Sequence, residues 1–274
     1  STMPLRIVTA NVNGVRAARR NGGFGELAAL RAQVLCLQEV RATHEQLHEA
    51  IAGTAFSGWH VSHSPAATLG RNGVAVLSKQ QPSAVRVGLG APEFDDHGRW
   101  IEVDLDSAIG ALTVVSAYVP TGDAEKPEKQ AEKYRFLTAM DRRMSALATR
   151  ATRTDRQAFV SGDFNVAHRQ EDLKNWKGNL SSAGFLPEER AHIDRWLARG
   201  RWTDLGRVAA GDGHGPYTWW SWRGKAFDND AGWRIDYALA TKDLATRLRS
   251  VRVARAESYD TRWSDHAAVV VTFA

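Results

Sequence analysis

Amide, carboxylate, phenol and imidazole side chains recur at the ends of short apolar runs along this chain. Such runs are typical of strands, and a rigid sheet can fix side chains that lie far apart in the sequence. The polar residues concerned are Asn11, Asn13, Glu39, Tyr118, Asp163, Asn165, Asp236, Asp265 and His266. Turn capping explains an Asp or Asn beside a Gly, but not Glu39 after an apolar run or an Asp265-His266 pair that opens one. We therefore expect these residues to form one site.

The residue types in this set suit a hard divalent cation and the hydrolysis of a phosphodiester. Carboxylates and waters hold Mg²⁺ or Mn²⁺, whereas zinc prefers cysteine or clustered histidine, and we expect no zinc site from the histidines. Phosphodiester hydrolysis requires a positioned, deprotonated water, a cation or imidazole that neutralises developing charge, and donors to the non-bridging oxygens. Asp, Glu, His, Asn and Tyr can fill these roles. The predicted cofactor is Mg²⁺, with Mn²⁺ as the alternative.

Charge and aromatic content point to an anionic partner. The formal net charge is +5, which suits a polyanion such as nucleic acid. Most of the ten tryptophans fall between residues 176 and 233. Aromatic side chains beside basic residues can stack on bases or line a pocket, although many of these tryptophans are expected to pack in the core.

Strands and helices must position the polar set. Runs rich in β-branched residues predict strands at Leu5–Val12, Val34–Gln38, Gly73–Leu77, Trp100–Leu105, Leu112–Tyr118, Gln157–Gly162, Arg234–Ala240, Val251–Ala254 and Ala267–Phe273. Apolar spacings of three and four predict helices at Phe24–Leu30, Glu45–Ile51, Pro127–Arg150 and from Pro187 to Gly200. Strands outnumber helices and alternate with them irregularly. This favours two stacked sheets with helices outside over a doubly wound parallel sheet.

The 274 residues predict one domain, because no linker, repeat or low-complexity segment divides them. The longest apolar runs fall far short of the ~20 residues that cross a bilayer, and no export signal is present, so we expect a cytoplasmic protein without a membrane span. Cys36 lies in an apolar run and is expected to be a buried, inert thiol. Ser1 and Thr2 precede Met3 and are interpreted as a cloning remnant, which leaves a single catalytic domain over residues 3–274.

An ordered set of motifs resembles the exonuclease III class of apurinic/apyrimidinic endonucleases, in the endonuclease/exonuclease/phosphatase superfamily. The motifs are TANVNGVRA at 9–17, LCLQEVRA at 35–42, GVAVLSK at 73–79, SAYVP at 116–120, SGDFNVAH at 161–168, DLKNWKGN at 172–179, GFLPEER at 184–190, GWRIDYAL at 232–239 and SDHAAV at 264–269. SGDFN or SDH alone would be a weak signal, but the ordered set spans nearly the whole chain. The resemblance implies an α/β fold, a four-layered α/β sandwich of two packed mixed β-sheets flanked by helices.

The resemblance also implies residue roles. Glu39 would be the main metal ligand, with Asn11 and Asp265 nearby. Asp163 would activate or orient the attacking water, and Asn165 would help to place water or phosphate. His266 would stabilise the phosphate oxygens, Asp236 would fix its tautomer and favour its protonated form, and Tyr118 would contact phosphate or the leaving oxygen. Asn13 departs from relatives that carry Asp in this motif, which makes a second strong metal site less certain.

By the same resemblance, the substrate is double-stranded DNA with abasic sites or blocked 3′ ends. Trp219 and Trp233 would line a pocket for the flipped abasic nucleotide, and Ile235 would close it. Trp222, Arg223 and Lys225 lie on a polar, Gly-containing loop and are candidates for DNA contact. The implied reaction is Mg²⁺-dependent cleavage 5′ to the abasic site, giving 3′-hydroxyl and 5′-deoxyribose phosphate ends, together with 3′-5′ exonuclease and 3′-end-cleaning activity, by a monomer.

Three alternatives stay open. The chain could act mainly as a 3′-end-processing exonuclease or phosphatase, with the bulky His168 among the residues that could bias it that way. A phosphatase or phosphodiesterase for small or lipid-linked phosphates would keep the catalytic carboxylates but would not need the tryptophan pocket. A non-catalytic RNA-binding regulator can use the same fold, although the intact set of carboxylates and imidazole argues against it.

Overall fold

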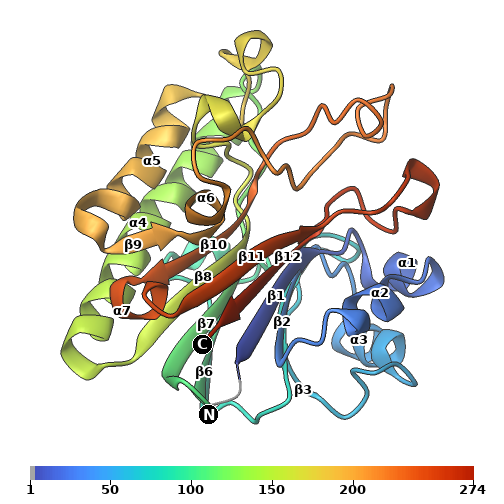
Figure 1. Ribbon diagram of the computed structural model, residues 1–274, viewed down its shortest axis with the longest axis vertical. Helices are drawn as coiled ribbons and strands as arrows, with labels where there is room; N and C mark the ends of the chain where they lie inside the picture. The colour runs from blue at the N-terminus through green and yellow to red at the C-terminus, as the bar shows by residue number, and fades with distance from the viewer. Residues whose placement is uncertain (1–3) are drawn as a thin grey trace.

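Two six-stranded sheets form the centre of the protein in a computed structural model that describes residues 4–274 (Figure 1). The first sheet has the order β11 (Leu248–Ala254), β12 (Ala268–Phe273), β1 (Leu5–Asn11), β2 (Val34–Gln38), β4 (Val74–Ser78) and β3 (His60–Ser64). The second has the order β5 (Ala84–Val87), β6 (Trp100–Ser107), β7 (Gly110–Tyr118), β8 (Gln157–Asp163), β10 (Asp236–Thr241) and β9 (Trp202–Asp204). The β1–β2 and β7–β8 pairs are parallel and the other pairs antiparallel, so both sheets are mixed. The interpretation of Ser1-Thr2 as a remnant lies outside the described residues.

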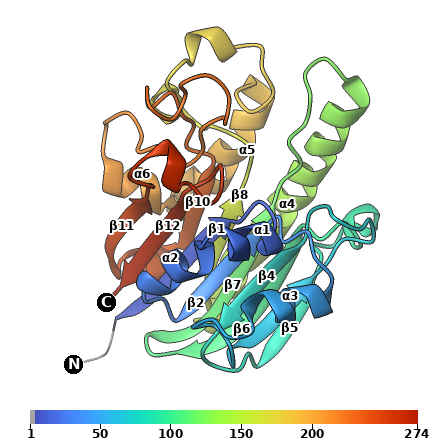
Figure 2. The same cartoon turned by 90° about the vertical axis from the view of Figure 1, so that its right-hand side faces the viewer.

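Helices cover the outer faces of both sheets (Figures 1 and 2). The first sheet is covered by α1 (Val15–Arg20), α2 (Gly23–Ala29) and α3 (His44–Ile51), and the second by α4 (Pro127–Thr154) and α5 (Pro187–Leu197). Two short helices, α6 (Leu205–Ala210) and α7 (Lys242–Ala245), flank β10. Within residues 4–274, no helix combines the length and the apolar character that a bilayer crossing requires.

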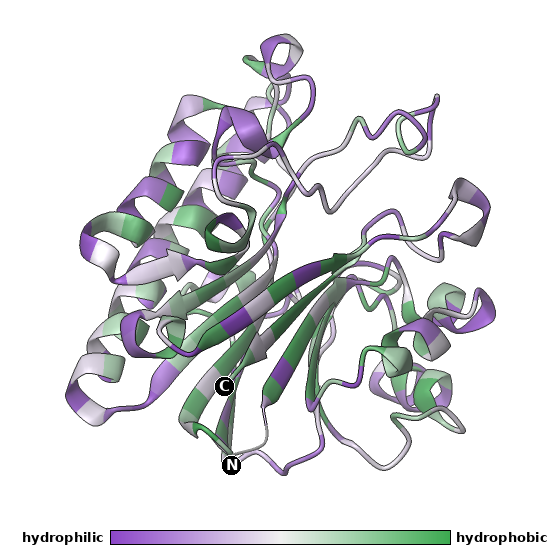
Figure 3. Cartoon of the chain, viewed as in Figure 1, coloured by the Kyte–Doolittle hydropathy of each residue, from purple (hydrophilic) through white to green (hydrophobic). Residues whose placement is uncertain are grey.

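Three apolar layers hold this arrangement together, and the predicted four-layered α/β sandwich is confirmed. Ile7 and Val103 belong to the core between the sheets, Leu47 to the layer under α1–α3, and Met140 to the layer under α4 and α5. Figure 3 shows mostly hydrophobic residues along the strands, and hydrophobic and hydrophilic ones alternating along the helices. Cys36 lies in the inter-sheet core, where burial raises the pKa of its thiol to about 12. The sulfur is therefore a packing group.

The strands predicted from strong apolar runs are present, with small shifts at their ends. The run at 34–38 matches β2, whereas β10 begins at Asp236 and not at Arg234. The backbone N–H of Arg234 donates to the Asp172 carbonyl and that of Ile235 to Thr218 Oγ1, so neither joins the ladder. Helix α5 ends at Leu197, and the segment up to Gly200 is a 3-10 turn. The edge strands β3, β5 and β9 were not predicted. Half-exposed patterns weaken the apolar signal in β3 and β5, and β9 has only three residues.

Candidate active site

The polar residues expected at strand ends meet at one edge of the two sheets, at the opposite end from the C-terminus (Figure 1). The strand register explains why. Tyr118 of β7 pairs with Asp163 of β8, and Asp163 pairs with Asp236 of β10. Asn11 ends β1, and Glu39 directly follows the parallel neighbour β2. Parallel strands that end and antiparallel strands that begin at the same edge therefore bring these residues together.

Several of these residues sit on strained backbone. Glu39 has φ 48°, Asn13 φ 49° and Asn165 φ 51°, all in the left-handed region. Asn tolerates this region more readily than Glu, for which it costs roughly 1–2 kcal/mol. Strain of this kind persists where the surrounding structure fixes it, and it clusters at functional sites.

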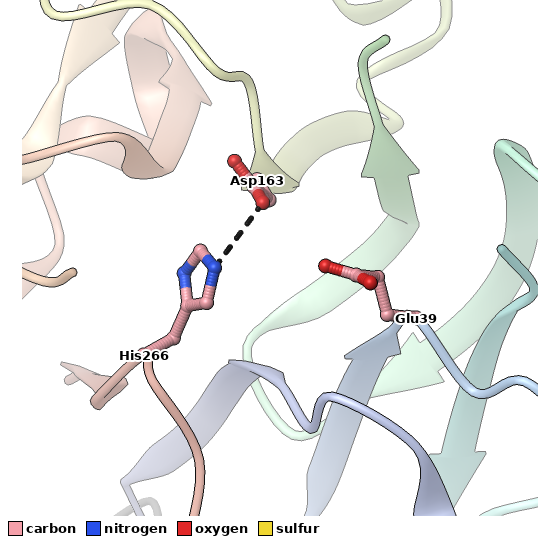
Figure 4. Close-up of side chains that lie close together, drawn as sticks. All are labelled: Glu39, Asp163 and His266. Atoms are coloured by element: carbon pink, nitrogen blue, oxygen red, sulfur yellow. Dashed lines mark ion pairs between the residues drawn. The ribbon is translucent and has the colours of Figure 1, made fainter. Parts of the chain in front are cut away.

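Glu39, Asp163 and His266 form the centre of the site (Figure 4). Each offers one possible ligand atom, and these atoms lie within 4.8 Å of one another. The Asn11 Nδ2 donates to Glu39 Oε1 at 2.8 Å and to Asp163 Oδ2 at 3.0 Å. Its Oδ1 accepts the backbone N–H of Asn13 at 3.0 Å. In this geometry Asn11 holds the two carboxylates in place, and its role as a metal ligand stays a prediction.

His266 lies between two carboxylates. Its Nδ1 is 2.8 Å from Asp236 Oδ2, and its Nε2 is 3.5 Å from Asp163 Oδ2. Burial by itself would lower the pKa of His266, but the charges of Asp236 and Asp163 outweigh it and raise this pKa to about 10. The imidazole is therefore a cation at neutral pH, with Asp236 fixing its orientation.

The pKa of Asp163 is also raised. Burial, and then the nearby charges of Asp236 and Glu39, raise the pKa of Asp163 above the usual carboxyl range, while His266 opposes the rise. A carboxylate of raised basicity accepts a proton from water more readily than an ordinary one.

An excess of acceptors makes this edge suitable for a divalent cation. Asp265 Oδ2 accepts from Trp219 Nε1 at 3.2 Å, but Asp265 Oδ1 is buried without a hydrogen-bond donor among residues 4–274. Asp236 Oδ1 is in the same situation. Buried oxygens without donors are costly unless water or an ion satisfies them. The oxygen donors of this edge fit Mg²⁺ or Mn²⁺, with the Glu39 carboxylate at their centre, and His266, as a cation, is not among the ligands.

Tyr118 and Asn165 lie beside this centre. Burial, followed by the charges of Glu39 and Asp163, raises the pKa of Tyr118, so the phenol keeps its proton and can donate it in a hydrogen bond. The backbone N–H of Asn165 donates to Asp163 Oδ1 at 3.0 Å, and its Nδ2 donates to the Val119 carbonyl at 2.8 Å. Tyr118 thus lies near both carboxylates, and Asn165 contacts Asp163.

Sequence reasoning missed the basic residues that surround the site. The Arg99 guanidinium lies 5.0 Å from the centre of the Tyr118 ring, and the Arg41 guanidinium pairs with Glu39. Lys133 of α4 is fully buried, pairs with Glu189 of α5, and donates to the carbonyl of Asn165 at 2.8 Å. The partners of Arg99 and Lys133 are distant in the sequence, so no local pattern marks these two residues, whereas Arg41 lies two residues from its partner Glu39.

The tryptophans expected to line a pocket adjoin this centre. Trp219 and Trp233 are both half-buried, with ring centroids 6.4 Å apart in an edge-to-face arrangement. Trp219 also forms an isolated bridge with His266, which ties the aromatic pair to the catalytic edge. Ile235 is buried, and Gly184 packs so closely on Trp233 that a Cβ there would lie 3.0 Å from the ring.

The predicted contact loop projects from the same edge (Figure 1). Trp222, Arg223 and Lys225 are exposed there. The Trp222 ring packs edge-to-face on Tyr259 of the neighbouring loop, at 5.8 Å between centroids. His168 contacts α5. Its ring is buried, and its Nε2 is 2.6 Å from Asp194 Oδ1.

Comparisons with known proteins agree with this geometry. Residues 8–266 match the Endonuclease/Exonuclease/phosphatase family. The chain is 33% identical to an exodeoxyribonuclease of Bacillus subtilis over 271 residues, covering 97% of this chain and 98% of the relative. It is 32% identical to the DNA repair nuclease APEX1 of Danio rerio over 247 residues, covering 89% of this chain and 75% of the relative.

Solved structures extend the likeness to the whole fold. The 3′ phosphatase NExo from Neisseria, bound to a product DNA hairpin, has a TM-score of 0.84 and 27% identity, covering 98% of this chain and 99% of that one. An AP endonuclease from Archaeoglobus fulgidus has a TM-score of 0.80 and 27% identity, with the same coverage. The chain therefore belongs to the endonuclease/exonuclease/phosphatase family, in its exonuclease III class of DNA repair nucleases.

Proposed function

We propose that this protein hydrolyses the phosphodiester 5′ to abasic sites in double-stranded DNA, with Mg²⁺ as cofactor and Mn²⁺ as a substitute. The products would be a 3′-hydroxyl and a 5′-deoxyribose phosphate, and blocked 3′ ends would be trimmed by the same chemistry. The observation that carries this proposal is the contact between the Asp236–His266–Asp163 array and the Trp219–Trp233 pair. The groups for hydrolysis and the aromatic side chains that would contact a nucleotide without a base then lie at the same edge of the sheets. Acting on DNA, the protein would be DNA-associated in the cytoplasm, as a monomer.

The chemistry follows from the roles of the side chains. Asp163, with its raised basicity, takes a proton from a water molecule whose oxygen attacks the phosphorus. The bond from phosphorus to the 3′ oxygen breaks, so the phosphate stays on the abasic sugar. His266 stabilises the negative charge that develops on the phosphate oxygens, and the Tyr118 phenol donates to the phosphate or the leaving oxygen. Glu39 would hold a divalent ion, which would supply further charge neutralisation when bound.

The pocket gives selectivity for a nucleotide without a base. A flipped abasic sugar can pack against Trp219 and Trp233, whereas a normal nucleotide must also fit its base beside two large rings. Trp222, Arg223 and Lys225, which are exposed, would contact the duplex. Contacts of this kind to phosphates are salt-dependent and do not depend on sequence.

Action mainly at 3′ ends is the second candidate, because the fold also matches NExo, which is described as a 3′ phosphatase and as a 3′-5′ exonuclease. A duplex with one synthetic abasic site and a duplex with a recessed 3′ end distinguish the two when both are incubated with Mg²⁺ or EDTA. A single metal-dependent nick 5′ to the lesion supports the proposal, and digestion from the 3′ end alone supports the second candidate.

The same assay tests the role of Asp163. Asp163→Asn should bind the abasic duplex normally and lose at least ~10²-fold in turnover. Asp194→Asn, at an exposed carboxylate on α5, is the matched control and should cut normally. Binding without any cleavage by the unmodified protein would instead favour the RNA-binding regulator.

A further inference from the structure

A group of three histidines lies outside the nuclease site, on the far side of the first sheet. The segment 44–48 has the sequence HEQLH, and His44 is the first residue of α3, after a capping box of Thr43 and Gln46. His44 and His48 are four residues apart on this helix and therefore share a face. Two histidines at this spacing on a helix are an established zinc-binding arrangement. The expectation that the histidines offer no zinc site overlooked this pair.

The third histidine comes from the strand that α3 covers. In β3, Val61 packs into the apolar layer under α1–α3, and His63 lies on the same face because strand side chains alternate. The Nδ1 atoms of His63 and His44 are 3.0 Å apart, and the two rings are nearly perpendicular, at 89°. Two nitrogens bound to one tetrahedral zinc at about 2.0–2.1 Å would be separated by about 3.3 Å. The observed separation is within a small side-chain rotation of that value.

The contacts of His63 leave its ring free to turn toward a metal ion. The Nε2 of His63 is buried without a hydrogen-bond partner in residues 4–274, so no contact on that side holds the ring in another orientation.

We propose that His44, His48 and His63 form a zinc-binding site that joins the start of α3 to the edge strand β3. His44 and His63 already face each other, and the exposed His48 completes the set by rotating its side chain, since the three nitrogens do not yet lie within 4.8 Å of one another. Water fills the fourth position. The ion cross-links α3, which begins five residues after Glu39, to β3. Because β3 is the last strand of its sheet, the backbone groups along one of its sides have no neighbouring strand.

Zinc binding can be measured on the whole protein with variants of exposed residues. After removal of metals, Zn²⁺ is titrated in excess Mg²⁺ with a chromogenic chelator as competitor, and the melting temperature is recorded with and without Zn²⁺. His44→Ala and His48→Ala should each weaken zinc binding at least about tenfold, because each removes one ligand. His63→Ala should remove both the binding and the thermal shift. His60→Ala is the matched control, since His60 lies on the opposite face of the same strand and is exposed.

A second variant separates this site from the nuclease centre, which can also take up Zn²⁺. Glu39→Gln should keep the zinc bound by the histidines, and the histidine variants should keep Mg²⁺-dependent cleavage. Equal zinc affinity in His44→Ala, His48→Ala and His60→Ala would overturn the proposal. Loss of zinc binding in Glu39→Gln, with zinc binding retained in all three histidine variants, would also overturn it. Unchanged zinc affinity in His48→Ala would do the same, because the site would then lack its third ligand.

Discussion

Replacing Asp236 with asparagine should move the alkaline limit of cleavage to lower pH. The Asp236 carboxylate lies 2.8 Å from His266 Nδ1, and both side chains are buried. It is the strongest of the charges that raise the pKa of His266 to about 10 against the lowering effect of burial. Activity needs the imidazolium, which exists below this pKa. Loss of the carboxylate charge lowers the pKa, so the cation and the activity disappear at a lower pH.

The size of the shift follows from the geometry. Two unit charges about 4 Å apart interact by about 4 kcal/mol at an effective dielectric constant near 20. At 1.36 kcal/mol per pKa unit, this corresponds to a shift of about 3 units. Asparagine keeps an acceptor for the Nδ1–H and has nearly the same shape, so the change isolates the charge. We expect the alkaline limit to fall from about 10 to near neutral pH.

The assay is single-turnover cleavage of an abasic duplex in saturating Mg²⁺, from about pH 6 to about pH 10, because the limits of such profiles report the catalytic acid and base. Asp141→Asn is the control, since His192 Nδ1 and Asp141 Oδ2 form a similar pair, at 2.9 Å, between α4 and α5. Asp141→Asn should show the same pH profile of cleavage as the unmodified protein. An alkaline limit that is the same in Asp236→Asn and in the unmodified protein would refute the assignment of that limit to His266.

Three further predictions concern the metal, the pocket and the fold. Glu39→Gln should raise the Mg²⁺ concentration for half-maximal cleavage at least about tenfold, since a carboxylate ligand loses its charge; an unchanged titration would remove Glu39 from the ligand set. Trp233→Ala should weaken abasic cleavage by about 5- to 150-fold, the equivalent of about 1–3 kcal/mol of lost apolar contact with the flipped sugar, and digestion of a recessed 3′ end less; equal losses in the two assays would make Trp233 a structural residue. Lys133→Met should lower the free energy of unfolding by about 3–5 kcal/mol in urea, because it leaves the buried Glu189 carboxylate without its cation; an unchanged midpoint would contradict this.

Local sequence patterns determined much of the fold. Continuous apolar runs predicted buried strands such as β2, and spacings of three and four predicted the long helix α4, because both signals depend only on neighbouring residues. The same patterns could not find the edge strands β3 and β5. An edge strand is defined by the partner on its one paired side, and its exposed positions carry polar residues that break the apolar run.

The residue types at the strand ends follow from the order of the amino acids alone, and their chemistry already favoured a divalent cation and phosphodiester hydrolysis. Which of those strand ends meet depends on the folded chain. It turned the Asn11 amide nitrogen toward Glu39 and Asp163, and it buried Lys133 beside the carbonyl of Asn165. It also raised the pKa of His266. Hydrogen bonds and charge interactions act over a few ångströms of space, and the residues that share that space here come from the beginning, the middle and the end of the chain.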